Sequence, residues 1–270
     1  MKNLFRIPLL LLGLSAFFFS CEDEPDLGPP PVVDFEVSAK VAEIGELLAF
    51  TNNSTVESGT PTFEWNFGDG DLSEKESPTH FYSDTGTYVV TLKVTSEMGA
   101  SEMVEQNVRV GRRYLKSLEL LSWADSNIVD IVDDTIVWGP WDEDGSGPDI
   151  SWVVFGPEGI GDIDTRANPV ADVTTGPVVI DITGDYLLAN SLYTVAIVDV
   201  DDVNNADSID IIVVRNQSLN PLNPNLTLHE NSAGQFITGK NPDTGEGAVL
   251  IGNDPNQLDL GIGFMNFEIR

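Results

Sequence analysis

Few cysteine and histidine residues occur in this sequence. There is one cysteine, Cys21, and there are two histidines, His80 and His229. A single cysteine cannot form an internal disulfide. A Ser-His-Asp triad would have to use one of the two histidines, and neither lies in a supporting motif. The sequence therefore does not support catalysis by a Ser-His-Asp triad.

Common catalytic motifs are also missing from the sequence. It contains no Gly-x-Ser-x-Gly elbow, no His-Glu-x-x-His pair and no phosphate-binding Gly-Lys-Ser/Thr loop. A glycosidase needs only two carboxylates. In a chain with 44 acidic residues some pair will always lie close, so such a pair indicates nothing. We expect a protein that is not an enzyme, with a carbohydrate-active enzyme as the catalytic alternative.

Basic residues are scarce. The sequence has 13 lysines and arginines against 44 acidic residues, a formal net charge of −31. Such a surface repels phosphate backbones and anionic headgroups, so we exclude nucleic acid as a partner. The charge also means that clustered carboxylates must be separated, screened or bound to a metal.

Residues 1–21 have the three parts of a signal peptide. Lys2 and Arg6 give a positive start, and residues 7–19 form an apolar run of 13 residues. A transmembrane helix needs about 20 residues, so this run is too short to span a bilayer. We therefore expect a targeting segment that plays no part in the fold.

Cys21 closes this segment, in the run Phe18-Phe19-Ser20-Cys21. The run resembles the lipobox of bacterial lipoproteins, in which a peptidase cuts just before a cysteine that carries lipid. The resemblance implies an exported protein whose membrane partner is reached through lipid on Cys21. The alternative is an ordinary secretory signal with an incidental cysteine.

Residues 22–32 are acidic and rich in proline. The acidic run, residues 22–26, resembles the export tag of gram-negative lipoproteins that face the cell exterior. It implies an outer membrane lipoprotein on the outside of the cell, and the alternative is a solvated acidic linker. The prolines favour an extended, semi-rigid chain, so we expect a tether.

Residues 33–111 show the pattern of short β-strands. Apolar and polar residues alternate in several runs, which marks strands with one buried face. Clusters of glycine and aspartate at 68–71 and 84–86 separate the runs and predict tight turns. A small β-sandwich is therefore expected. The alternating residues are Val33, Phe35 and Val37; Phe63, Trp65 and Phe67; and Tyr88, Val90, Leu92 and Val94.

Three segments of this region carry a sharper resemblance. The segments Trp65–Gly70 (WNFGDG), Thr79–Tyr82 (THFY) and Gly86–Val94 (GTYVVTLKV) together resemble a polycystic kidney disease (PKD) domain. That family implies an immunoglobulin-like sandwich that serves as an extracellular spacer or binding module without a catalytic role.

Two polar residues of these segments have alternative interpretations. Asp69 at a hairpin tip could bind a cation or a ligand, or the Gly-Asp-Gly segment could simply make the turn next to core residues Trp65 and Phe67. We favour the turn. We expect His80 to be a structural residue that hydrogen-bonds across a strand end.

Residues 114–270 are again rich in β-patterns, and Gly111-Arg112-Arg113 is a plausible junction. About eight strands are expected, enough for one larger sandwich. The clearest apolar positions are Tyr193, Val195 and Ile197; Ile209, Ile211 and Val213; and Ile262 and Phe264. The sequence therefore predicts an all-β chain of two sandwiches in tandem.

Two aspartate-rich loops stand out in this second region, residues 141–149 and 199–207. Each places several carboxylates next to an apolar strand. Calcium takes 6–8 oxygen ligands, and carboxylates supply them while offsetting its charge. Neither loop contains cysteine or histidine, the residues that zinc and copper favour as ligands, so the loops do not suit these two metals.

The pair of loops resembles the calcium site of C2 domains. That family uses two aspartates in one loop and an Asp-x-Asp-x5-Asp run in a distant loop. The resemblance implies a C2-like sandwich with calcium as cofactor, and the alternative is two solvated turns. The implied metal ligands are Asp142, Asp149, Asp199, Asp201 and Asp207.

These features lead to one main hypothesis about function. We expect a non-enzymatic cell-surface lipoprotein that binds a glycan or a protein and is stabilised by calcium. One alternative is a calcium-dependent phospholipid-binding module, although no Lys/Arg cluster accompanies the loops. Another is an accessory subunit or enzyme of carbohydrate metabolism.

Overall fold

The computed structural model describes residues 26–123, 127–132, 135–139, 146–158, 160, 162–200, 211–252 and 261–270. Within these ranges every regular element is a β-strand, which confirms the expected all-β class. A search of the same residues for a long apolar helix that could cross a membrane finds none.

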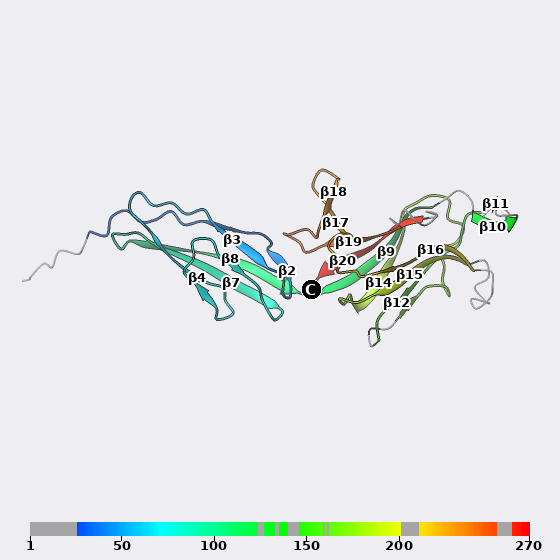
Figure 1. Cartoon of the computed structure of the whole chain (residues 1–270), viewed down its shortest axis with the longest axis horizontal. Helices are drawn as coiled ribbons and strands as arrows, with labels where there is room; N and C mark the ends of the chain where they lie inside the picture. The colour runs from blue at the N-terminus through cyan, green and yellow to red at the C-terminus, as the bar shows by residue number, and fades with distance from the viewer. Residues whose placement is uncertain are drawn as a thin grey trace, which may run out of the picture.

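The first sandwich comprises strands β1 to β8 and consists of two sheets (Figure 1). The smaller sheet has the order β1-β3-β6, and the larger has the order β2-β8-β7-β4-β5. The strands are β1 (Phe35–Val37), β2 (Val41–Glu43), β3 (Leu48–Asn52), β4 (Thr62–Asn66), β5 (Leu72–Ser73), β6 (Thr79–His80), β7 (Gly86–Thr95) and β8 (Ser101–Gly111).

The predicted alternation in the first sandwich places its apolar residues in the core. On β7, Val90, Leu92 and Val94 are fully buried. Val89, whose side chain points to the opposite face of the strand, is 46% exposed. Trp65 is buried at the centre of the cluster, with the ring of Phe35 packed edge-on at 5.0 Å. The indole N–H of Trp65 donates to the carbonyl of Lys75 (2.9 Å), so its polar atom is satisfied as well.

The second sandwich comprises β9 to β20. A six-stranded sheet has the order β14-β9-β20-β19-β17-β18, a four-stranded sheet has the order β13-β12-β15-β16, and β10 and β11 form a hairpin. The strands are β9 (Arg113–Trp123), β10 (Asn127–Val132), β11 (Thr135–Gly139), β12 (Ile150–Phe155), β13 (Asp162–Asp164), β14 (Val178–Leu187), β15 (Tyr193–Val200), β16 (Ile211–Leu219), β17 (Thr227–Glu230), β18 (Phe236–Thr238), β19 (Gly247–Ile251) and β20 (Gly261–Ile269).

The core of the second sandwich lies between its two large sheets. Trp152 and Tyr193 from the four-stranded sheet share one buried cluster with Leu118 and Met265 from the six-stranded sheet. The described residues hold twelve strands, β9 to β20, so the expected number of about eight was too low. Several of the additional strands are too short to show an apolar alternation in the sequence.

Strand β20 has one face in the core and one face outside it. Its core-facing residues are Met265 and Phe267, whereas Ile262 is 37% exposed and Phe264 lies on the opposite face. The register with β9 shifts between Ile262 and Gly263 because Leu121 of β9 is an extra, unpaired residue there, while β20 alternates without interruption from Gly261 to Ile269. Phe264 is nevertheless only 5% exposed, although it is not part of the core cluster between the two large sheets.

The two sandwiches are joined without a flexible linker. β8 ends at Gly111 and β9 begins at Arg113, so only Arg112 separates them. The N–H of Arg112 donates to the carbonyl of Arg270 (2.8 Å), and the N–H of Arg270 donates back to the carbonyl of Arg112 (3.0 Å). At the junction the chain is therefore paired through Arg112 with the residue that follows β20, and the end of β20 lies beside it (Figure 1).

One loop of the second sandwich, residues 240–246, is hydrogen-bonded to the first sandwich through backbone groups. The N–H groups of Lys40 and Val41 both donate to the carbonyl of Pro242, at 2.8 and 3.0 Å. Gly245 has φ +78°, and a Cβ built on it would lie 2.4 Å from Cγ1 of Val41. The close approach of loop 240–246 to the first sandwich therefore depends on glycine at this position.

Side chains add to this contact. The side chain of Lys240 is 9% exposed, and its Nζ donates to the carbonyl of Val41 (2.8 Å) and to Oε1 of Glu46 (2.9 Å). From the first sandwich, Nη2 of Arg109 donates to the carbonyl of Thr244 (3.1 Å). Because both sandwiches contribute donors and acceptors, a change in their relative orientation would break several of these bonds at once.

Candidate functional site

The predicted site residues divide into those that the structure describes and those that it does not. Cys21, Asp142, Asp201 and Asp207 lie outside the described residues. Asp149 and Asp199, which belong to the two different aspartate-rich loops, are described.

The structure brings Asp149 and Asp199 together although they are 50 residues apart in the sequence. The N–H of Asp149 donates to Oδ1 of Asp199 (2.6 Å), and the N–H of Val200 donates to the carbonyl of Asp149 (3.0 Å). Asp199 is fully buried. Asp149 directly precedes β12, and Asp199 lies in β15. The two strands are paired with Ile150 opposite Asp199, so this pairing positions both carboxylates.

A third aspartate, Asp172, approaches the same pair and was not predicted. Its N–H donates to Oδ1 of Asp149 (2.8 Å), and its φ is +52°. Aspartate tolerates this left-handed conformation better than most residues. Apart from this tolerance, nothing in the sequence around Asp172 indicates its contact with Asp149, because the segment has no acidic motif.

Asp199 lies at the end of the second sandwich away from the first. β14 ends at Leu187, which pairs with Tyr114 near the junction, and β15 begins a short loop later at Tyr193. β15 therefore runs away from the junction towards Asp199 and Val200. The predicted calcium loops begin at this far end of the molecule.

The donor atoms of this pair suit a hard cation. Asp149 and Asp199 offer carboxylate oxygens, which calcium prefers, and the backbone N–H bonds described above hold each carboxylate in place. Asp142, Asp201 and Asp207 would complete the set, and calcium stays a prediction because they fall outside the described residues.

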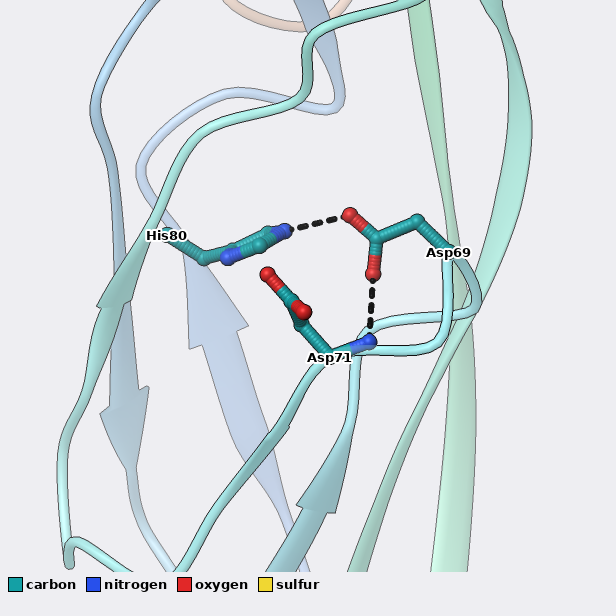
Figure 2. Close-up of side chains that lie close together, drawn as sticks. All are labelled: Asp69, Asp71 and His80. Carbon is teal, nitrogen blue, oxygen red and sulfur yellow. Dashed lines mark hydrogen bonds and ion pairs between the residues drawn. The ribbon is translucent and has the colours of Figure 1, made fainter.

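A second polar cluster lies at one end of the first sandwich, where Asp69, Asp71 and His80 come within 4.8 Å of one another (Figure 2). Nε2 of His80 lies 2.7 Å from Oδ2 of Asp69, and the N–H of Asp71 donates to Oδ1 of Asp69 (3.1 Å). Gly68 and Gly70 flank the tip with φ of +84° and +104°, as the predicted tight turn requires.

The ring of His80 is enclosed by aromatic neighbours. Phe67 stacks on it at 4.2 Å, and Tyr82 packs edge-on at 4.7 Å. Partial burial tends to raise the pKa of Asp69, but its hydrogen bonds to His80 and to the Asp71 N–H outweigh this and hold the pKa below its usual value. The expected hydrogen bond of His80 across a strand end is confirmed, and we interpret the cluster as a structural clamp.

Comparison with known proteins agrees with these observations for the first sandwich. A family model described as "PKD domain" matches residues 28–110. The pre-pro-metalloprotease PrtV of Vibrio cholerae serotype O1 is 26% identical over 125 residues, which are 46% of this chain and 13% of the protease. The chain therefore spans a small part of that relative. The matched domain type is itself non-catalytic and occurs in secreted or surface-associated bacterial proteins.

Two solved structures are similar to the chain over different lengths. The crystal structure of the PKD1 domain from PrtV is 32% identical, covers 30% of this chain and 98% of that domain, and has a TM-score of 0.28. A structure of carbohydrate-binding modules from the β-sandwich superfamily is 15% identical, covers 89% of this chain and 91% of its own, and has a TM-score of 0.31.

Proposed function

We propose, because residues 28–110 of this chain belong to the PKD domain family, that the protein is a non-catalytic binding protein of the cell surface. In this proposal lipid on Cys21 anchors the chain, the PKD domain is a stiff spacer, and the second sandwich binds a glycan or protein. Calcium held by the aspartate-rich loops stiffens the far end of the molecule.

The observation that carries this proposal is the direct hydrogen bonding between the two sandwiches. Domains of one chain move relative to each other by default, unless their interface is extensive. Here a connection of one residue between β8 and β9, backbone bonds to Pro242 and the largely buried side chain of Lys240 all oppose such movement. A spacer that fixes the orientation of its neighbour is the function that this geometry serves best.

The path of the chain supports the spacer role. Leu27 and Gly28 lie beside Gly99 and Met98, in the turn between β7 and β8. That turn lies at the opposite end of β8 from Gly111 and the junction. The described chain thus begins at the end of the first sandwich farthest from the second (Figure 1), which would place the PKD domain between the membrane and the second sandwich.

Calcium should stabilise the whole mature chain. Extracellular calcium sites have dissociation constants of about 10⁻⁴–10⁻³ M, so about 10 mM calcium should add about 1.4–2.7 kcal/mol to the free energy of unfolding. Thermal melting with calcium and with a chelator measures this, and Asp201→Asn should abolish most of the shift.

Magnesium at the same concentration is the control, since it demands a smaller octahedral site and keeps its waters. A melting temperature that is the same with calcium and with chelator would remove the metal from the proposal and leave the spacer unaffected.

A further inference from the structure

A pocket of about 280 Å³ lies on the outer face of the six-stranded sheet, which is the face turned away from the core. Phe264 and Asn266 of β20 line it, while Met265 and Phe267, which alternate with them, are buried in the core. The sheet's period of two therefore separates a packed face from a face that carries this pocket.

One wall of the pocket is aromatic. Phe236 of β18 stacks on Phe264 with ring centroids 5.4 Å apart and an angle of 23° between the rings. Phe264 is 5% exposed, whereas Phe236 is 56% exposed. Since Phe264 covers one side of Phe236, the other side of the Phe236 ring is open to a ligand.

Most other side chains that line the pocket are polar, and several of them are held in place. Nδ2 of Asn266 donates to Oε2 of Glu119 (3.0 Å) and to Oγ of Ser117 (3.1 Å). Oε1 of Glu246 is 2.9 Å from Nζ of Lys116. Ordered carboxylates next to an exposed ring match the few positioned polar groups that orient ligands in binding pockets.

The charge of the lining excludes one class of ligand. The pocket is lined by three glutamates, Glu119, Glu230 and Glu246, and its described lining includes neither lysine nor arginine. In a chain of net charge −31, such a pocket repels phosphates, sulfates and carboxylates. The ligand must therefore be neutral or cationic.

A neutral sugar fits this combination. The C–H face of a pyranose ring is apolar and slightly positive, and it complements the negative face of an aromatic ring. Sugar hydroxyls donate to carboxylate and amide oxygens. A cationic peptide is less well served, because Glu246 is already ion-paired and phenylalanine is not the best aromatic partner for a cation.

We propose that this pocket binds a neutral sugar residue of a glycan, with the pyranose ring stacked on the exposed face of Phe236 and its hydroxyls bonded to Glu119 and Asn266. The proposal rests on the binding role given above to the second sandwich, and it names the site and the ligand class.

The position of the pocket connects it to the PKD domain. Asn241 and Thr244, in loop 240–246, line the pocket. The carbonyl of Thr244 accepts a hydrogen bond from Arg109 of the first sandwich. The PKD domain therefore supports one wall of the pocket.

The test is binding of the full mature chain to an array of neutral oligosaccharides built from glucose, galactose, mannose and xylose. The same array carries uronic acid oligomers as anionic ligands and a lysine-rich peptide as a cationic ligand. We expect retention on at least one neutral oligosaccharide, and Phe236→Ala should weaken it about tenfold or more. Phe236→Tyr, which keeps the ring face, should retain most of the binding.

The matched control is Phe155→Ala, which removes a phenylalanine that is 50% exposed on the other sheet of the same sandwich and should leave binding unchanged. Melting curves check that the variants fold. Equal binding by the wild type and Phe236→Ala would overturn the assignment of the glycan site to this pocket, and the glycan would then bind elsewhere on the protein. No retention on any neutral oligosaccharide, or retention on the peptide alone, would overturn the ligand class.

Discussion

Replacing Arg113 with alanine should lower the free energy of unfolding by about 3–5 kcal/mol, because it leaves a partly buried carboxylate without its partner. Arg113 is 6% exposed, and its Nε lies 3.1 Å from Oε1 of Glu43, across the junction. Its guanidinium also lies over the ring of Phe267, 3.9 Å from the centroid, and Nη1 donates to Oγ1 of Thr227 (3.2 Å). One side chain thus ties both sandwiches together.

Urea unfolding followed by tryptophan fluorescence measures the effect of Arg113→Ala, and we expect the second sandwich to unfold at a lower urea concentration than in the wild type. The matched control is Arg166→Ala. Arg166 pairs with Asp164 in a local, more exposed bridge, and such pairs contribute about 0–1 kcal/mol. Equal losses for the two variants would contradict a special role for Arg113 at the junction.

Replacing Cys21 with serine should abolish lipid attachment completely. Serine has no thiol to accept the lipid, so the variant should incorporate no radiolabelled fatty acid when cells are grown with it. The wild type should be labelled and should sediment with the membrane fraction. Metabolic labelling followed by immunoprecipitation and mass spectrometry of the N-terminal peptide measures both.

The control for this experiment is Ser20→Ala, which changes the neighbouring residue, keeps the thiol and should remain labelled. Fatty-acid labelling is the deciding readout because an uncleaved signal segment could hold the serine variant in the membrane without lipid. A labelled Cys21→Ser protein, or an unlabelled wild type, would show that Cys21 is not the anchor.

Much of the first sandwich follows from its sequence. The alternation of Tyr88, Val90, Leu92 and Val94 reflects a strand with one face in the core, and the glycines at the Asp69 turn have the positive φ that such a turn requires. Patterns of this kind are local, so they can be recognised without knowing which strands pair.

The pairing of Asp149 with Asp199 depends on non-local information. Their neighbourhood arises because β12 and β15 are hydrogen-bonded partners, and periodicity does not state which strands pair. Only the resemblance to a known loop arrangement predicted that the two aspartates would meet. Asp172, which completes the contact, lacks any such signal.

The pocket and the junction could not be predicted from sequence patterns. Phe264 lies on the face of β20 opposite Met265, and which of the two faces meets the core depends on the sheet that packs against it. Phe236 sits on a strand of three residues, too short to show a period. The bonds of loop 240–246 to the first sandwich join segments about 200 residues apart, such as Lys240 and Val41.

The fixed orientation of the two sandwiches is tested most directly by a distance distribution between them. Spin labels on cysteines introduced at Glu57 in the first sandwich and Glu158 in the second, in the mature chain with Cys21→Ser, allow double electron–electron resonance to measure it. Both positions are exposed, so labelling should leave the fold unchanged. A single narrow distance distribution is expected, and it should broaden in Arg113→Ala. A broad distribution in the otherwise unaltered chain, of the kind that two freely jointed domains give, would contradict the spacer role.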